Sequence, residues 1–274
     1  MPVDPDLLRR IDAYLDAAPR TGARAEDVGP FTVFLNEGHG WRYYARPTPG
    51  ASGITPVDVD ALRRHQRDRA QPEAIEWIDE LAPELGGAAA EAGMHVAAHP
   101  LMALAEFTSR VHPATALVRI VDADDDLAEL SAVADVAFAA PGTHTGPAGP
   151  AEATAAAREQ SADTIAFQRG RMLAGLTVAA AASIDGVTAS VGWHQPLDGA
   201  SEVVGVATLP MYRRRGLAAA VTGALVADAL ERGVDTVFLS ADDDDVARVY
   251  ETVGFRRVGT SCAASAPIPR REPS

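Results

Sequence analysis

Several residue types are absent from this chain or scarce in it, and each absence excludes a class of protein. The 274 residues include one cysteine, Cys262, so an internal disulfide framework is excluded. The chain has no lysine, and this excludes the Gly-Lys-Ser/Thr ending of a nucleotide-binding phosphate loop. A Gly-x-Ser-x-Gly nucleophile elbow is also missing. No uninterrupted apolar run reaches the roughly 20 residues that a membrane-spanning helix needs, so we expect no membrane partner.

The charge balance of the chain is acidic, with a formal net charge of -14. Nucleic-acid binding needs basic surface, so this balance opposes a nucleic-acid partner, whereas it is compatible with cationic substrates such as amines. All 24 basic residues are arginine and alanine is abundant, which is typical of the coding bias of a GC-rich bacterial genome. Residues 1–6 lack the basic and apolar segments of a signal peptide, so we expect a cytoplasmic protein. The seven histidines are scattered, so no metal site is expected.

The stretch from Pro210 to Ala218 carries the strongest chemical signal. The apolar run Val203–Leu209 before it predicts a buried strand, and the alanine-rich stretch Ala218–Glu231 after it predicts a helix. The residues between them therefore form a strand-to-helix turn. Free backbone N–H groups and the helix dipole make such a turn an anion site, and Gly216 has no side chain to block a phosphate.

Two motifs in this region resemble the GNAT superfamily of acyl-CoA N-acyltransferases. Arg213-x-x-Gly216-x-Ala218 after a strand is similar to the family signature Gln/Arg-x-x-Gly-x-Gly/Ala. Residues 249–255, Val-Tyr-Glu-Thr-Val-Gly-Phe, resemble the family segment Leu-Tyr-Glu-x-x-Gly-Phe. They follow one helix and one strand, in the order that the family requires. The resemblance implies an α/β (α+β) fold with a mixed, mostly antiparallel central sheet flanked by helices.

The domain organisation follows from the extent of this resemblance. We expect an N-terminal α/β unit over residues 1–112, which is too short for a complete second copy and is interpreted as a degenerate partial one. The acetyltransferase domain would cover 113–265, and a flexible tail would cover 266–274. The N-terminal unit would shape the acceptor pocket or supply a homodimer interface.

The apolar patterns predict the elements of both parts. In the first they are helices over 4–18, Pro56–Arg69 and Pro72–Ala92, strands Phe31–Leu35 and Trp41–Ala45 around a hairpin loop at 36–40, strand pieces Met94–Ala97 and Leu101–Leu104, and a link at Val111–Pro113. In the second they are strands Ala116–Val121, Leu176–Ser183, Val187–Trp193, Val203–Leu209, Thr236–Ser240 and Arg256–Cys262, and helices Leu127–Phe138, about 151–168, Ala218–Glu231 and Asp243–Val253.

The resemblance implies acetyl-CoA as cofactor and indicates how it would be held. The amides of Arg214, Gly216 and Ala218 would face the pyrophosphate, and the backbone of Val206, Ala207 and Thr208 would pair with the pantetheine arm. Asp243 stands where family members often carry a cofactor-contacting Asn, although here it lies in a run of four aspartates, one of which is expected to cap the helix. The full predicted cofactor site is Val206, Ala207, Thr208, Arg213, Arg214, Arg215, Gly216, Leu217, Ala218 and Asp243.

Two residues are the candidates for proton transfer. Tyr250 matches the family tyrosine and would protonate the departing thiolate as general acid; otherwise it packs one face of a helix. Glu202 begins the motif strand and would be the base; otherwise it is a surface residue. His194 is a second base candidate, and Trp193, Tyr212 and the loop Thr143–Thr145 are candidates for the acceptor side, with core or surface roles as the alternative.

These observations predict a GNAT-like N-acetyltransferase that transfers an acetyl group to a small-molecule amine or a peptide amine by direct attack. The alternative is a non-catalytic acyl-CoA-binding or regulatory protein. Tyr250 and Glu202 discriminate between the two, because a pure binding module needs neither.

Overall fold

The computed structural model describes residues 4–36, 38, 42–108 and 116–267, and these form two compact units. The first unit comprises Met1–Pro100 and Val258–Ser274, and the second comprises Leu101–Arg257. Two strands, β5 (His95–Leu104) and β11 (Phe255–Ser265), run from one unit into the other. The chain therefore passes between the units within strands. None of the helices in the described ranges combines the length and apolar character that crossing a bilayer requires.

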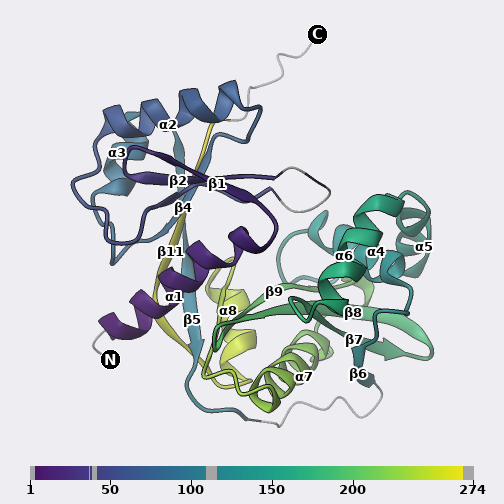
Figure 1. Cartoon of the computed structure of the whole chain (residues 1–274). Coiled ribbons are helices and arrows are strands. Elements are labelled where there is room, and N and C mark those ends of the chain that lie inside the picture. The colour runs from purple at the N-terminus through teal and green to yellow at the C-terminus, as the bar shows by residue number, and fades with distance from the viewer. Residues whose placement is uncertain (1–3, 37, 39–41, 109–115, 268–274) are drawn as a thin grey trace. The chain divides into compact units, whose positions relative to one another are not determined.

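The first unit consists of short strands and three α-helices around one apolar core (Figure 1). A three-stranded antiparallel sheet has the order β1–β2–β3, and β4 pairs antiparallel with the second half of β11. Phe31, Trp77 and Leu85 are fully buried in its core. The elements are α1 (Pro5–Ala17), η1 (Pro19–Thr21), β1 (Arg24–Val28), β2 (Phe31–Leu35), β3 (Arg46–Pro47), α2 (Pro56–Asp68), β4 (Ala74–Ile78) and α3 (Leu85–Glu91).

Capping residues determine where the helices of the first unit begin. The Asp4 carboxylate accepts from the backbone N–H groups of Asp6 and Leu7, and Pro5 follows as the first helical residue of α1. At the start of α2, Thr55 and Asp58 form a capping box, in which each side chain accepts from the backbone N–H of the other residue.

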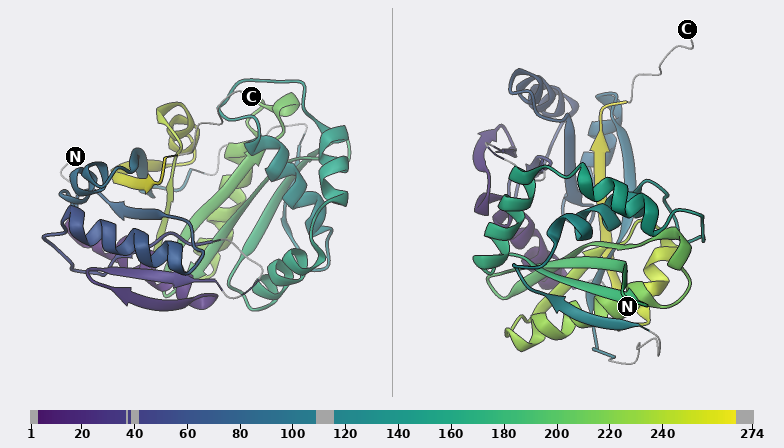
Figure 2. Two further views of the ribbon diagram at one scale, coloured as in Figure 1. Left: turned by 90° about the horizontal axis from the view of Figure 1, so that it is seen from above. Right: turned by 90° about the vertical axis from the view of Figure 1, so that its right-hand side faces the viewer.

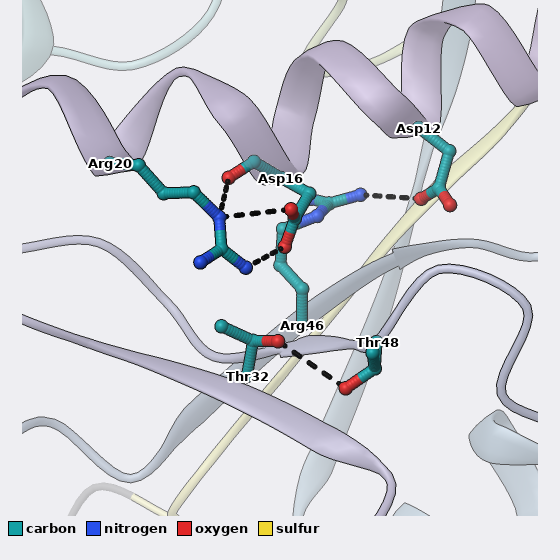
Figure 3. A network of polar contacts seen from close by, with 6 residues as sticks. All are labelled: Asp12, Asp16, Arg20, Thr32, Arg46 and Thr48. Atoms are coloured by element: carbon teal, nitrogen blue, oxygen red, sulfur yellow. Dashed lines mark hydrogen bonds and ion pairs between the residues drawn. The ribbon is translucent and has the colours of Figure 1, made fainter. Parts of the chain in front are cut away.

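A buried arginine fastens α1 to the strands of the first unit. The Arg46 side chain is 2% exposed and forms ion pairs with Asp12 on α1 (3.3 Å) and with Glu76 on β4 (3.0 Å). Figure 3 shows the Arg46 guanidinium reaching from β3 to the Asp12 carboxylate, while Asp16 binds the more exposed Arg20. Burial raises the pKa of Asp12 despite the opposing charge of Arg46.

The second unit is a mostly antiparallel sheet with helices on both faces. Its strand order is β5–β10–β9–β8–β7–β6, and only β9 and β10 are parallel neighbours. Helices α4, α5 and α6 lie over one face of strands β7 to β9 and α7 over the other, as Figures 1 and 2 show. The elements are β6 (Leu117–Val121), α4 (Leu127–Phe138), α5 (Pro150–Arg158), α6 (Ala162–Leu173), β7 (Val178–Ile184), β8 (Val187–Leu197), β9 (Ala200–Thr208), η2 (Pro210–Tyr212), α7 (Leu217–Glu231), β10 (Thr236–Ser240) and α8 (Asp244–Glu251).

The predicted mixed, mostly antiparallel sheet flanked by helices is confirmed, and so are most elements after residue 116. Helix α4 and strand β10 have the predicted bounds. The β7–β8 hairpin turns at Asp185 and Gly186, whose φ values of 51° and 79° suit the predicted Asp-Gly turn. The apolar core of this unit includes Val221, Leu225 and Phe238, all of them fully buried.

The predicted helix over Pro72–Ala92 is wrong. Residues 74–78 form strand β4, in which only Glu76 is less than fully buried, and the helix α3 starts at Leu85. A strand that is covered on both faces is apolar along its length, so its pattern does not distinguish it from a short buried helix. Strand β1, which is not apolar, is missing from the prediction altogether.

Three further predictions need correction. The helix predicted over about 151–168 is two helices, because the Ser161 hydroxyl caps a new helix by accepting from the N–H of Thr164. The strand pieces on either side of Pro100 are one strand, β5. The strand predicted at Trp41–Ala45 is replaced by β3 at Arg46–Pro47, with only a bridge at Ala45.

The domain division at 112/113 stays a prediction. The predicted link at Val111–Pro113 lies outside the described residues, as do residues 37 and 39–41 of the predicted hairpin and most of the predicted tail. The division between the two compact units lies instead at Pro100/Leu101 and at Arg257/Val258.

Candidate functional site

The second unit contains a cleft of 1040 Å³ beside strand β9. One side consists of Glu202–Thr208 and the turn that leads into α7, and another consists of Val246, Val249 and Tyr250 of α8. Residues from the end of α4 and the loop after it complete the lining. The cleft therefore joins the two segments that carry the sequence motifs.

The cleft exists because two parallel strands separate. Strands β9 and β10 are paired from Ala200 and Thr236 to Glu202 and Phe238, and no later pair is found between them within the described residues. Strand β9 nevertheless continues to Thr208, still paired with β8 on its other side. Val206, Ala207 and Thr208 thus lie in the cleft on a strand whose second edge faces away from β8. A free edge of this kind accepts an extended ligand by strand addition.

A bulge bends β9 at the middle of the cleft. The register between β8 and β9 shifts between Val191 and Trp193, and opposite this shift Gly205 has φ of +65°. A Cβ on Gly205 would lie 2.8 Å from the Trp193 ring, so the close approach of this ring requires glycine here. Trp193 packs against the apolar core, and the structure does not place it in the cleft lining, where it had been a candidate for the acceptor side.

The turn after β9 leaves the first amides of α7 available at the cleft. Gly216, with φ of +77°, is the N-cap residue of α7, and no side chain caps this end of the helix. Arg214 also has a positive φ, +64°. Gly216, Leu217 and Ala218 line the cleft. An uncapped helix N-terminus presents unpaired N–H groups and positive partial charge, so this end of the cleft suits a phosphate or another anion.

The three arginines of the turn have different partners. The Arg213 guanidinium donates to four backbone carbonyl oxygens, those of Thr208 (3.2 Å), His144 (3.0 Å), Ala137 (2.9 Å) and Ala140 (2.6 Å). Arg215 lies over the ring of Tyr212, 5.1 Å from its centroid. The Arg214 side chain makes no hydrogen bond or ion pair with any residue that the structure describes, and it lines the cleft.

Tyr250 projects from α8 into the cleft lining. It is 8% exposed, and its ring meets the edge of Phe255 with the centroids 6.1 Å apart. Its hydroxyl has no hydrogen-bond partner among the described residues. Burial raises its pKa to about 12, so the hydroxyl is protonated at neutral pH and can donate a proton.

Glu202 and the aspartates of residues 242–245 supply the acidic groups of the cleft. Glu202 lies in β9 at the last β9–β10 pair, opposite Phe238, and its half-buried side chain lines the cleft, as Tyr250 does. The Asp243 carboxylate accepts from the N–H of Val246 (2.8 Å) and so caps α8. Asp242 and Asp245 are the aspartates of this run that line the cleft.

His194 does not reach the cleft. It is fully buried, with Nδ1 2.8 Å from the Ser201 hydroxyl and Nε2 2.9 Å from the carboxylate of Asp228 on α7. Asp228 also binds Arg232. Desolvation lowers the pKa of His194 below its ordinary value, despite the neighbouring carboxylate. His194 therefore joins β8, β9 and α7 and is not a base for a substrate.

This burial makes the stability of the second unit depend on pH. The unfolded chain binds a proton at His194 more readily than the folded chain does, so the contribution to stability is full above about pH 6.5 and is lost as the pH falls below it. We expect the Tm to fall between pH 7.5 and 5.5, and the fall to be smaller in His194→Gln. The exposed His95→Gln is the control. Equal slopes in wild type and His194→Gln would contradict this assignment.

One wall of the cleft was missing from the sequence prediction. Ala137 and Phe138 at the end of α4, with Pro141, Gly142 and Thr143, line the cleft, and Phe138 remains 58% exposed. Of the predicted loop Thr143–Thr145, Thr143 lines the cleft and His144 supplies a carbonyl to Arg213. Tyr212 also lines the cleft. The only signal in the sequence for this wall is the Gly/Pro-rich composition of residues 141–150.

The chain is similar to known proteins at the level of the fold. The FR47-like protein family model matches residues 183–263. The structure of a GCN5-related N-acetyltransferase from Kribbella flavida is 22% identical, with a TM-score of 0.72, and the match covers 96% of this chain and 97% of that one. A GCN5-related N-acetyltransferase from Sphaerobacter thermophilus is 17% identical, with a TM-score of 0.55 over 95% of this chain and 91% of that one.

A GCN5-related N-acetyltransferase-like protein from Streptococcus suis is 15% identical, with a TM-score of 0.55 and coverage of 95% and 98%. No curated protein sequence matches this chain. Together these likenesses show a GNAT superfamily fold, as the two motifs predicted.

Proposed function

We propose that this chain, which has the GNAT superfamily fold, is an N-acetyltransferase that takes its acetyl group from acetyl-CoA. The observation that carries the proposal is the cleft, in which the edge of β9, the uncapped N-terminus of α7 and Tyr250 meet. The edge of β9 suits the amide groups of a pantetheine arm, and the helix N-terminus suits its pyrophosphate. These features fit an acyl-CoA better than they fit a compact ligand.

The residues that would hold acetyl-CoA follow from this fit. The backbone of Val206, Ala207 and Thr208 would pair with the pantetheine arm, and the turn that includes Gly216 and Ala218 would hold the phosphates with its amides. Arg214 and Arg215 would add positive charge. When bound, acetyl-CoA supplies a thioester, an acyl group already activated for transfer. Asp243 would serve this site indirectly, because its carboxylate caps α8.

Two side chains of the cleft would handle protons. Glu202 would take a proton from the ammonium group of the acceptor, directly or through a water, which frees the nitrogen lone pair. The new N–C bond forms as the C–S bond breaks, and Tyr250 would donate its proton to the departing sulfur. The acceptor is then a small-molecule amine or a peptide amine, and its positive charge suits the carboxylate of Glu202.

A free-thiol release assay tests this proposal. Purified full-length protein is mixed with acetyl-CoA and a panel of polyamines, amino acids, aminoglycosides and peptides with free N-termini, and the release of CoA thiol is followed. The proposal predicts release above the rate without acceptor for at least one class of amine. Acetyl-CoA binding without release for any amine would support a non-catalytic acyl-CoA-binding protein instead.

A further inference from the structure

The side chain of Arg213 is spent inside the protein, although its position in the motif places it beside the proposed phosphate site. Its three guanidinium nitrogens donate to carbonyl oxygens of β9, of the last turn of α4 and of the loop after α4. Three of these carbonyls, those of Ala137, Ala140 and His144, lie 69 to 76 residues earlier in the chain. A guanidinium with this many acceptors has little capacity left for a phosphate.

The carbonyls that Arg213 binds are ones that need a partner. The last C=O groups of a helix have no intrahelical donor, and the helix dipole favours a cation there. Ala137 lies in the last turn of α4 and Ala140 directly follows that helix. Arg213 therefore ends α4 in the way that a capping side chain does, from a distant part of the sequence.

The loop after α4 is fastened to the same turn by its backbone. The N–H of Gly146 donates to the carbonyl of Pro210 (3.2 Å), and the N–H of Met211 donates to the carbonyl of Ala148 (3.0 Å). A Cβ on Gly146 would lie 3.2 Å from Cβ of Pro210, so the two segments are in close contact. Arg213 and these two hydrogen bonds together hold the wall formed by residues 137–143 in place.

We propose that Arg213 is a positioning residue that fixes the wall of residues 137–143 beside the cleft, and that it is not a phosphate ligand. This inference deepens the proposed function and rests on it where donor binding is concerned. It predicts that the shape of the guanidinium matters more than its charge. A lysine at 213 would keep the charge but would present its donors at a single point, so it could not reach the four carbonyls together.

Amide hydrogen exchange on the free protein tests the positioning role without any assay of activity. We expect Arg213→Lys and Arg213→Gln both to speed exchange at the amides of Gly146 and Met211 by at least about tenfold, with exchange in α7 unchanged. Arg214→Gln removes the same charge from the same turn and should leave these amides at wild-type rates. Wild-type exchange in Arg213→Lys would overturn the proposal.

Two acetyl donors then separate positioning from phosphate binding. Acetyl-CoA and S-acetylpantetheine share the thioester arm, but only acetyl-CoA carries phosphates. We expect the Arg213 variants to lose affinity and kcat/KM for both donors by a similar factor, and Arg214→Gln to lose more with acetyl-CoA. A loss confined to acetyl-CoA in Arg213→Gln, largely restored in Arg213→Lys, would show a phosphate ligand and would overturn the proposal.

Gly146→Val provides a variant that leaves Arg213 intact. The added side chain overpacks the contact with Pro210, so it should loosen the same wall and repeat the loss with both donors. Wild-type behaviour of Gly146→Val would count against the proposal if the Arg213 variants do not fold. If the wild-type protein binds neither donor, the proposed function fails, and the exchange measurement still decides the positioning role.

Discussion

Replacing Tyr250 by phenylalanine is expected to reduce kcat for acetyl transfer by about 100- to 10,000-fold, the usual contribution of a general acid. The ring would still meet Phe255 and fill its place in the core, so only the proton donor is removed. Affinity for acetyl-CoA should stay within about twofold, because the proposed donor contacts lie on β9 and the turn before α7. Steady-state kinetics combined with calorimetry measure both quantities.

The high pKa of Tyr250 adds a pH test to the same experiment. With a pKa of about 12, the hydroxyl keeps its proton over the whole range in which the enzyme can be assayed. The rate should therefore show no loss from tyrosine ionisation on the alkaline side. Tyr44→Phe in the first unit is the matched control. If Tyr250→Phe and wild type turn over equally, Tyr250 has no part in the reaction.

The substitution Gly254→Ala is expected to cause the largest loss of stability. Gly254 has φ of +116°, and a Cβ at this position would lie 1.7 Å from the carbonyl oxygen of Glu106. The Gly254 carbonyl also accepts from the N–H of Ala105 (3.1 Å), so the two backbones cannot separate without losing this contact. Overpacking and left-handed strain together give a destabilisation of at least about 3 kcal/mol.

A loss of this size is a large fraction of the roughly 5–15 kcal/mol that stabilises most domains. Urea denaturation followed by circular dichroism measures it. Gly223→Ala is the matched control, because that glycine lies within α7 and nothing stands within 4 Å of the added methyl group. The control should gain about 0.5–1 kcal/mol. Equal stability of Gly254→Ala and wild type would contradict the packing described here.

The parts of the fold that were predictable are those that local chemistry determines. The turn before α7 needs a residue with positive φ at Gly216, and the β7–β8 hairpin needs Asp185 and Gly186, so both are evident from a few adjacent residues. The sheet class followed from two short motifs and the order of elements between them. The cleft position also followed, because the motifs fall on neighbouring segments of one unit.

The parts that were not predictable depend on contacts between distant residues. Nothing near Arg213 indicates that its side chain binds carbonyls of α4, and nothing near His194 indicates that α7 covers it with Asp228. The run 74–78 was mistaken for helix because its burial on both faces comes from packing that no local pattern records. The roles of Tyr250 and Glu202 and a homodimer interface stay predictions.

Calorimetric titration of the wild-type protein with acetyl-CoA tests the central claim most directly, because everything else depends on an acyl-CoA entering the cleft. We predict binding at one site per chain, with a Kd of about 1 mM or tighter, in line with ordinary enzyme–substrate affinities. Desulfo-CoA should compete for the same site. The absence of binding at millimolar acetyl-CoA, by calorimetry and by thermal shift, would show that the turn before α7 is structural and would contradict the account.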